Sequence, residues 1–284
     1  MAGTQAPKVQ DKKRKRDDGD KTAPASKKQE RSKDKKFSSK KNNYNGKNKN
    51  KKGQDDKKFN KQTNAYQQPE REEGVDETIS KMNEQILADY FMQKAKSHNK
   101  DLTAVELSDM SVPVHAFLDT TSFEPSRDLE QLPDFLKTYS PDKGARLGDA
   151  SEEKGSPHTL VIAAAGLRAA DLVRALRSFQ SKDAAVAKLF AKHIKIEEAK
   201  QFLERSRVSI GVGTPQRIID LLESGTLKTT GLERIVIDGS HIDQKKRGIF
   251  DMKEVYAPLL KLLARDEFRK RYGPKEKSLM VLVY

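Results

Sequence analysis

Three turns in the second half of the sequence carry residues that could act on phosphate groups or metal ions. Each turn follows an apolar run, at 158–165, 208–212 and 233–237. The residues concerned are Arg168 in the first turn, Thr214, Gln216 and Arg217 in the second, and Asp238, Gly239, Ser240 and His241 in the third. Arginines and helix N-termini bind phosphate, whereas aspartate and histidine can hold a metal ion or transfer a proton.

The first two turns are candidates for contact with an RNA backbone. Thr214 followed by Pro215 is also a common way to start a helix, so this turn has a purely structural interpretation as well. We expect Arg168 and Arg217 to begin exposed helices. A further basic group, Lys245, Lys246 and Arg247, is either a solvated loop or another phosphate contact. The residues alone leave RNA contact and a structural role open at all these positions.

Asp238 and His241 lack the surroundings of a catalytic or metal site. No serine, cysteine or threonine beside them has the setting of an activated nucleophile, and the five histidines show no metal-ligand spacing. The absence of cysteine excludes thiol catalysis and disulfide scaffolds. We therefore expect Asp238 to hydrogen-bond the loop that follows it, and we expect no catalytic residue, no metal and no cofactor.

The net charge of the protein comes from its N-terminal region. Residues 1–69, the basic tail, contain 22 of the 56 Lys and Arg and 8 of the 42 Asp and Glu. This is a net charge of +14, and the remaining 34 basic and 34 acidic residues cancel. Apart from alanines, the basic tail has six apolar side chains, too few to offset its ordering entropy, so it is predicted to be disordered.

Two basic clusters in the tail are typical of a nuclear import signal: Lys12, Lys13, Arg14, Lys15 and Arg16, followed by Lys27 and Lys28. An import receptor is therefore an expected partner, although a solvated basic run without a receptor has the same composition. Such a tail also binds nucleic acid without sequence preference, by counterion release. Its four scattered aromatic residues, Phe37, Tyr44, Phe59 and Tyr66, are able to stack on unpaired bases.

Residues 76–157 are predicted to be mainly helical, with extended connections. Apolar spacing predicts one helix of about five turns over 79–95, and Thr103 and Glu106 form a capping-box pattern before a short second helix. Residues 111–127 are predicted to be extended, 129–139 helical with Pro133 in the first turn, and 140–157 a loop. No run of about 18 apolar residues exists, so no membrane-spanning helix is expected. The N-terminus lacks the apolar stretch of a secretory signal.

From residue 158 onward, strands and helices alternate. Strands are predicted at 158–165, 188–194, 208–212, 233–238 and 278–283, and helices at 167–179, 196–205, 215–223 and 252–271, the last kinked at Pro258. This alternation produces right-handed crossovers and a parallel sheet. We predict an α/β fold with three regions: a disordered Lys-rich tail over 1–75, a helical and extended N-terminal extension over 76–127, and a single lobe with a parallel sheet flanked by helices over 128–284.

The three turns and their spacing resemble the first RecA-like lobe of DEAD-box RNA helicases over residues 158–284. The equivalent features there are a P-T-R-E-L-A turn, a T-P-G-R turn and a D-E-A-D strand end. The specific part of the match is the T-P-x-R turn at its spacing before V-I-D. In the helicases both turns touch the RNA backbone, which the resemblance extends to Arg168 and Arg217.

Departures from the helicase pattern argue against ATP turnover. The sequence has no G-x-x-x-x-G-K-[ST] loop for nucleotide phosphates, and the stretch where it belongs is expected to be the loop 140–157. Asp238 keeps the position of the Mg²⁺ ligand, but Gly239 replaces the Glu that positions water, and Ser240 and His241 replace the last two residues. The sequence also ends where a helicase continues to a second lobe. The resemblance therefore implies a degenerate lobe that is not an enzyme.

The Lys-rich tail, the helix KMNEQILADY, the segment ELSDMSVP and this degenerate lobe together resemble the Cms-one family. Its members are nucleolar proteins of the 90S pre-ribosome and small-subunit processome. The resemblance covers about residues 76–284 and implies a structural factor in small-subunit rRNA maturation, in the nucleus and nucleolus. Expected partners are pre-ribosomal RNA or small nucleolar RNA and processome proteins, with no membrane. Two alternatives stay open: a partner-dependent, RNA-stimulated ATPase or helicase remnant, and a general basic nucleic-acid-binding protein of chromatin.

Overall fold

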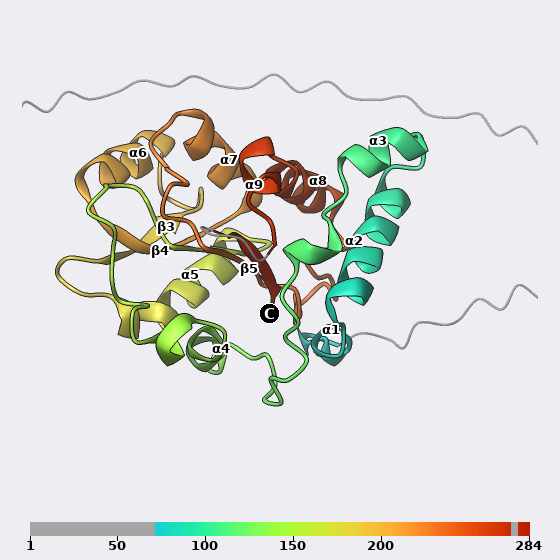
Figure 1. Ribbon diagram of the computed structural model, residues 1–284, viewed down its shortest axis with the longest axis horizontal. Coiled ribbons are helices and arrows are strands. Elements are labelled where there is room, and N and C mark those ends of the chain that lie inside the picture. Colours follow the sequence, from blue (N-terminus) through green and yellow to red (C-terminus); the bar gives the residue numbers. More distant parts are fainter. Residues whose placement is uncertain (1–71, 274–277) are drawn as a thin grey trace, which may run out of the picture. The chain divides into compact units, whose positions relative to one another are not determined.

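The computed structural model describes residues 72–273 and 278–284 (Figure 1). They belong to one compact unit, Asn64–Tyr284. The predicted import signal and the aromatic residues of the basic tail lie outside the described residues.

A five-stranded parallel sheet forms the centre of this unit. Its strands are β2 (Thr159–Ile162), β3 (Ala185–Leu189), β4 (Val208–Gly213), β5 (Arg234–Ile237) and β7 (Met280–Val283), in the order β3-β4-β2-β5-β7. All four neighbouring pairs are parallel. Every residue of β2, β4 and β5 is buried, as expected when helices cover both faces of a sheet. The predicted fold class is confirmed.

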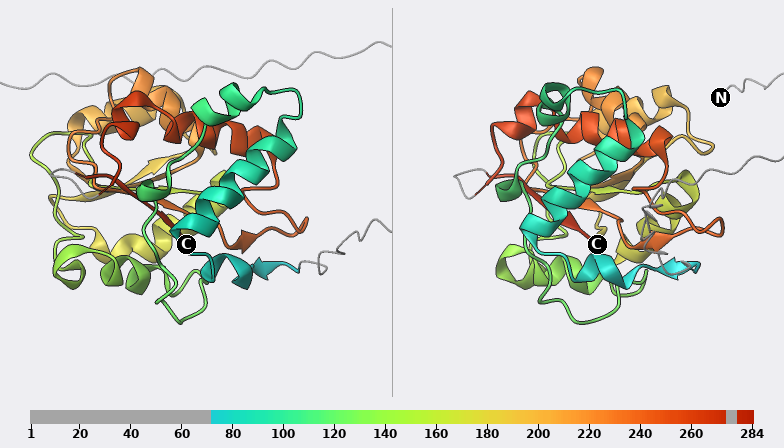
Figure 2. Two further views of the ribbon diagram at one scale, coloured as in Figure 1. Left: turned by 45° about the vertical axis from the view of Figure 1, so that its right-hand side comes forward. Right: turned by 90° about the vertical axis from the view of Figure 1, so that its right-hand side faces the viewer.

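Helices cover both faces of the sheet (Figures 1 and 2). One face carries α2 (Glu84–His98), α6 (Ile196–Arg205), α7 (Pro215–Glu223), α8 (Lys253–Leu263) and α9 (Asp266–Arg269); the other carries α4 (Leu132–Thr138) and α5 (Gly166–Ala175), which continues as a 3₁₀ turn, Leu176–Phe179. Alternate strand residues enter the two cores: Ile235 and Ile237 pack on the first face and Val236 on the second.

The segment before the lobe packs onto the same core. It contains α1 (Glu77–Ser80), α2, α3 (Ala104–Asp109) and a 3₁₀ turn, Val114–Ala116. Phe91 of α2 contacts Phe250 with ring centroids 5.0 Å apart, and the Tyr256 hydroxyl donates to the Phe91 carbonyl at 2.5 Å. The helix predicted over 79–95 is two helices, because Asn83 accepts a hydrogen bond from the Ile86 amide and starts a new one. The capping box of Thr103 and Glu106 is confirmed.

Other boundaries differ from the prediction. The strand predicted at 188–194 is β3 at 185–189, because β3 is an edge strand whose Lys188 is exposed and interrupts the apolar run. The helix predicted over 252–271 is α8 and α9, and Pro258 lies inside α8. A two-residue antiparallel pair, β1 (Gly74–Val75) with β6 (His241–Ile242), has no periodic signal in the sequence. None of the helices in the described ranges is long and apolar enough to cross a membrane.

Candidate strand-end site

The three turns singled out in the sequence lie at neighbouring strand ends. β4, β2 and β5 are adjacent in the sheet, and α7, α5 and the segment Asp238–His241 follow their carboxyl ends. This edge is where open α/β folds bind their ligands.

Arg168 and Asp238 form a bidentate ion pair at this edge. Arg168 Nε donates to Asp238 Oδ2 at 2.9 Å, and Nη2 donates to Oδ1 at 3.0 Å. The two side chains are only 12% and 2% exposed. Burial alone would lower the pKa of Arg168, but the hydrogen bonds and charge of Asp238 outweigh it and raise that pKa above its ordinary value.

This ion pair corrects two expectations. Arg168 is not an exposed side chain at the start of a helix, because the carboxylate that ends the neighbouring strand holds its guanidinium. Asp238 does not hydrogen-bond the loop that follows it; its carboxylate accepts from Arg168, and its backbone amide donates to the Ile162 carbonyl at 2.9 Å. The contact joins residues 70 positions apart, which no local pattern could indicate.

Gly239 has no space for a side chain. A Cβ atom there would lie 2.5 Å from Val283 Cγ1 and 3.0 and 3.2 Å from two ring carbons of Phe250. The amides of Gly239 and Ser240 donate to the Tyr284 carbonyl at 2.8 and 2.7 Å, so the turn is bound to the end of β7. The space beside Gly239 is thus filled by core side chains.

His241 lies beside this turn, in the β1–β6 pair, where it is the partner of Val75. Burial lowers the pKa of His241; the charge of Asp238 opposes this effect and that of Arg168 adds to it. Within the described part of the chain, no hydrogen bond joins His241 to Asp238 and no group of three or more His, Cys, Asp or Glu could hold a metal ion.

The second turn starts α7 as predicted, with Thr214 in the N-cap position and Pro215 first in the helix. The Thr214 side chain caps no helix amide, and its backbone amide donates to the Leu189 carbonyl at 3.2 Å. Arg217 is half-buried, and its Nη1 donates to the Ile194 carbonyl at 3.2 Å. Gln216 is exposed and donates to Asp220 at 2.8 Å. Gln216 is therefore the most exposed of the three candidate side chains in this turn.

The basic group after the third turn is a tight loop closed on Asp243. The Asp243 carboxylate accepts from the amides of Lys245 and Arg247 at 2.8 and 2.9 Å, and from Arg247 Nη2 at 3.1 Å. Lys246 has a φ of 60°, in the left-handed region. Lys245 and Lys246 are exposed, whereas Arg247 is partly buried. Both lysines can reach an anion without breaking an ion pair.

A strand–loop–helix unit completes the edge beside β7. Phe117 forms a parallel bridge with Val281, and the Leu118 amide donates to the Val281 carbonyl at 2.9 Å. The chain then passes through residues 119–131 into α4, next to α5. A nucleotide phosphate loop has this strand–loop–helix arrangement.

The expectation that a phosphate loop would lie at 140–157 does not agree with the position of that stretch in the fold. That stretch lies at the amino ends of the strands, where the Gly155 amide donates to the Ser206 carbonyl just before β4. It lies at the opposite edge of the sheet from Asp238. Residues 119–131, not 140–157, are the loop that lies between a strand-like pair and a helix at the same edge as Asp238.

Arg127, in this loop, is a buried cation that no sequence pattern indicated. It is 1% exposed. Its Nη1 donates to the Val283 carbonyl at 2.6 Å, and its Nη2 donates to the Thr120 carbonyl and hydroxyl at 2.9 and 3.0 Å. Burial lowers the pKa of Arg127. A phosphate loop turns backbone amides toward an anion, whereas here the Thr120 carbonyl of the loop and the Val283 carbonyl of β7 face a cation, Arg127.

Fold and site together define a three-layer α/β lobe whose strand-end carboxylate is neutralised by an internal arginine. Residues 7–284 match the sequence model of the CMS1 protein family, which is described as a U3-containing 90S pre-ribosomal complex subunit. The chain belongs to this family. The family resemblance drawn from the sequence is confirmed.

Individual relatives agree with this assignment. The chain is 51% identical over 213 residues to protein CMS1 of Chaetomium thermophilum, covering 75% of this chain and 84% of the relative. It is 31% identical over 201 residues to human protein CMSS1, covering 71% and 66%. Among solved structures, Saccharomyces cerevisiae Dbp5 in complex with Nup159 and Gle1 is similar with a TM-score of 0.35 and 15% identity, over 57% of this chain and 42% of that one.

Proposed function

We propose that this protein is a non-catalytic assembly subunit of early small-subunit pre-ribosomes, acting as a scaffold during rRNA maturation in the nucleolus. The family description supports its association with the U3-containing 90S complex. Its proposed partners are pre-ribosomal RNA or small nucleolar RNA, processome proteins, and an import receptor for the two basic clusters of the tail.

The closed strand-end site is the observation that carries the non-catalytic part of the proposal. Phosphoryl transfer needs amides around the phosphates, a carboxylate free to hold Mg²⁺ and a residue that positions the nucleophile. Here carbonyls surround Arg127, Arg168 occupies both oxygens of Asp238, and Val283 and Phe250 fill the space beside Gly239. Each of these contacts therefore prevents one of the three requirements from being fulfilled.

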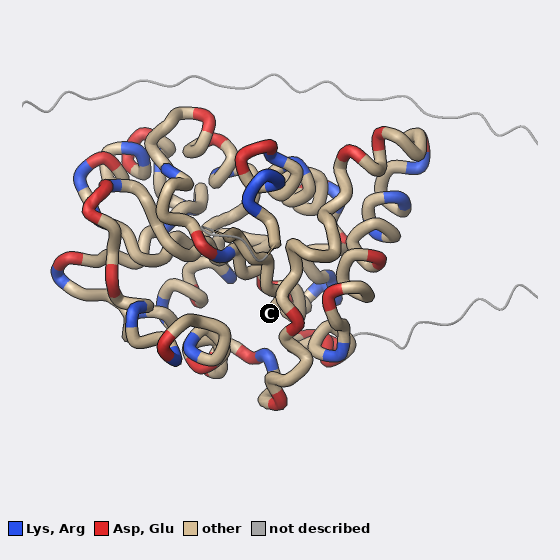
Figure 3. The backbone as a smooth tube through the Cα atoms, viewed as in Figure 1, with Lys and Arg blue, Asp and Glu red and all other residues tan. Residues whose placement is uncertain are grey.

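We propose that RNA contact at this edge relies on Lys245 and Lys246, with Gln216 beside the second turn. These three side chains are exposed, and Gln216 bonds only to Asp220 of its own helix among the described residues, whereas Arg168, Arg217 and Arg247 are more buried and bond to other segments or to a closed loop. The basic tail supplies the non-specific part of the affinity, since it carries the whole excess of positive charge. Figure 3 shows both signs of charge distributed over the described part of the chain, in agreement with the 34 basic and 34 acidic residues that follow the basic tail.

Charge reversal tests this surface. Lys245→Glu combined with Lys246→Glu should release the protein from particles that contain U3 RNA, measured by sedimentation of cell extracts. The matched control is Lys96→Glu with Lys100→Glu, two exposed lysines at and just after the end of α2, which should sediment like the wild type. Thermal melts should show that both double variants fold.

Two outcomes separate the parts of the proposal. Full co-sedimentation of the Lys245 and Lys246 variant with early pre-ribosomes would show that this edge is not the docking surface. Absence of the wild-type protein itself from U3-containing particles would contradict the proposed function.

A further inference from the structure

The two edges of the central sheet differ in what covers them. At β7 the outer edge is occupied by Phe117 and Leu118, through the bridge to Val281. At the other end, β3 is the outermost strand that the described residues form. An edge strand with unpaired backbone groups is a template for another extended chain.

The backbone of β3 directs specific groups away from the sheet. The Ala185 amide donates to Arg207 and the Leu189 carbonyl accepts from Thr214, so the odd-numbered residues face β4. The pairing of β3 with β4 shifts by one residue between Ala185 and Val186. The extra residue, Ser209, belongs to β4, so the alternation along β3 is not interrupted. Since successive residues of a strand alternate in direction, Val186 and Lys188 present their amide and carbonyl groups to the outside.

A groove of about 740 Å³ runs along this edge. One wall comes from α5 and the 3₁₀ turn after it, with Val173 and Arg177, and the other from α6, with Ala199 and Phe202. Val173, Val186 and Ala199 are buried apolar residues that line the groove, whereas Phe202 is 40% exposed. The groove thus wraps around the edge strand from one face of the sheet to the other, which is the space an added strand would fill.

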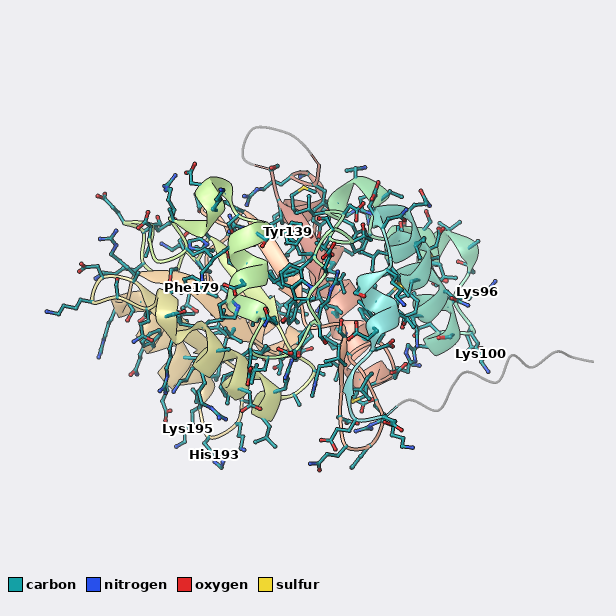
Figure 4. All side chains as sticks on the ribbon, turned by 90° about the horizontal axis from the view of Figure 1, so that it is seen from below. Lys96, Lys100, Tyr139, Phe179, His193 and Lys195 are labelled. Carbon is teal, nitrogen blue, oxygen red and sulfur yellow. The ribbon has the colours of Figure 1, made fainter. Side chains whose placement is uncertain are left out.

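The two sides of the groove differ in chemistry. On the α5 side, Arg177 and Lys188 are exposed, and Lys192 follows at the end of β3. His193 and Lys195, labelled in Figure 4, lie at the periphery of the molecule in the same β3–α6 connection. On the α6 side, Phe202 and Ala199 offer an apolar surface, with Glu198 the one carboxylate among the residues that line the groove.

From these contacts we propose that the β3 groove binds an extended segment of another protein as an added strand, and that acidic and apolar residues alternate in this segment. Side chains of a strand alternate between the two faces of a sheet. The acidic side chains would therefore meet Arg177 and Lys188, and the apolar ones Ala199 and Phe202. Backbone hydrogen bonds to Val186 and Lys188 would supply affinity without requiring one sequence, as in other complexes formed by strand addition.

This inference rests on the proposed function, because it names a class of protein partner for the scaffold. Its test uses the purified protein and needs no pre-ribosome. Random peptides of about ten residues, the upper length of common strands, are displayed on phage and selected on the purified full-length chain at about 0.15 M salt. The counter-selection uses the full-length Arg177→Glu, Lys188→Glu variant. Because this variant keeps the basic tail, acidic peptides that bind only the tail are removed.

We expect the selected peptides to alternate acidic and apolar residues and to bind the double variant about tenfold or more weakly, since two charge-assisted contacts are reversed. The Lys96→Glu, Lys100→Glu variant is the matched control and should bind like the wild type. Figure 4 places these two lysines on the side of the molecule away from His193 and Lys195. Amide exchange measured residue by residue should slow at Val186 and Lys188 when peptide is added.

Other results would overturn the proposal. These are failure to select any peptide that distinguishes the wild type from the groove variant, equal binding of the groove and control variants, or slowed exchange confined to other elements. A concentration-dependent dimer that the groove variant abolishes would show that a second copy occupies the groove. Protection of β3 by a single-stranded RNA probe, with no peptide selected, would assign the groove to RNA. A chain that fails the peptide test but still sediments with U3-containing particles would leave the proposed function intact.

Discussion

At position 239 the absence of a side chain is a packing requirement. A Cβ atom would approach Val283 Cγ1 to 2.5 Å and the Phe250 ring to 3.0 Å. We expect Gly239→Ala to lower the free energy of unfolding by about 1–3 kcal/mol through overpacking, measured by urea denaturation. In the double variant with Val283→Ala the closest overlap, that with Val283, is relieved, so the loss should be smaller than the sum of the two single losses. Additive losses would show that Val283 does not fill this space.

Two partly buried histidines give the fold a dependence on pH. Burial lowers the pKa of both His158 and His241, and for His158 the charge of Arg234 acts in the same direction. As the pH falls through the ordinary histidine range near 6.5, the unfolded chain binds protons that the folded chain does not. The contribution of the neutral histidines to the free energy of unfolding is therefore complete above that range, and the free energy of unfolding should fall between about pH 7 and pH 5.

The measurement is the free energy of unfolding in urea over this pH range. The slope contributed by each histidine is at most about 1.4 kcal/mol per pH unit. We expect His158→Gln to flatten the pH dependence without removing it, because His241 still titrates. A profile equally steep in His158→Gln would contradict the role given to His158.

At the scale of elements, the sequence predicted what local patterns determine. The bounds of α6 and α7 agree with the prediction, since their apolar stripes and the start at Thr214 and Pro215 are local signals. β3 was displaced because an exposed Lys188 interrupts its apolar run. The helix predicted over 129–139 is α4. The strand-like pair 117–118 escaped detection, because a single bridge to Val281 produces no periodicity.

The candidate site was predictable only in part, because local sequence patterns do not show contacts between residues far apart in the sequence. Strand ends could be located from apolar runs, and their adjacency followed from a parallel sheet. Whether Arg168 is exposed depends on Asp238, 70 residues away. Whether Arg127 is buried depends on the carbonyl of Val283, 156 residues away. Such contacts are decided by tertiary packing.

Arg127 joins three elements, and its removal should loosen them together. It binds the end of β7 through Val283, the loop through Thr120 and the end of α1 through the Ser80 carbonyl at 3.4 Å. Arg127→Ala removes the hydrogen bonds of a cation to the Val283 and Thr120 carbonyls and leaves a cavity, so we expect a loss of roughly 2–4 kcal/mol in the free energy of unfolding. Limited proteolysis should then cut within residues 119–131.

A matched arginine variant gives the comparison. Arg146 is largely exposed, with its side chain 76% accessible, and its ion pair within the described residues is with exposed Asp149. Arg146→Ala should change stability by no more than about 0.5 kcal/mol. Equal effects of the two substitutions would show that Arg127 contributes no more than a surface charge.

At the scale of the whole molecule, charge and fold are separated along the sequence. The basic tail carries +14 and the remainder has no net charge. Deleting residues 1–69 should therefore remove most of the salt dependence of RNA binding, since each neutralised phosphate contributes about 0.7 to the slope of log K against log salt on single strands. Filter binding across salt concentrations measures the slope. An unchanged slope would assign the phosphate contacts to the folded unit.

The central claim is that the strand-end site is closed to nucleotide, and titration calorimetry of the purified full-length chain with Mg²⁺ and ATP tests it most directly. We predict no saturable heat up to about 1 mM nucleotide, because binding at that level already requires about −4 kcal/mol. RNA should not change this result, nor should it stimulate phosphate release. Saturable binding at micromolar nucleotide, with phosphate release that Asp238→Ala abolishes, would contradict the account.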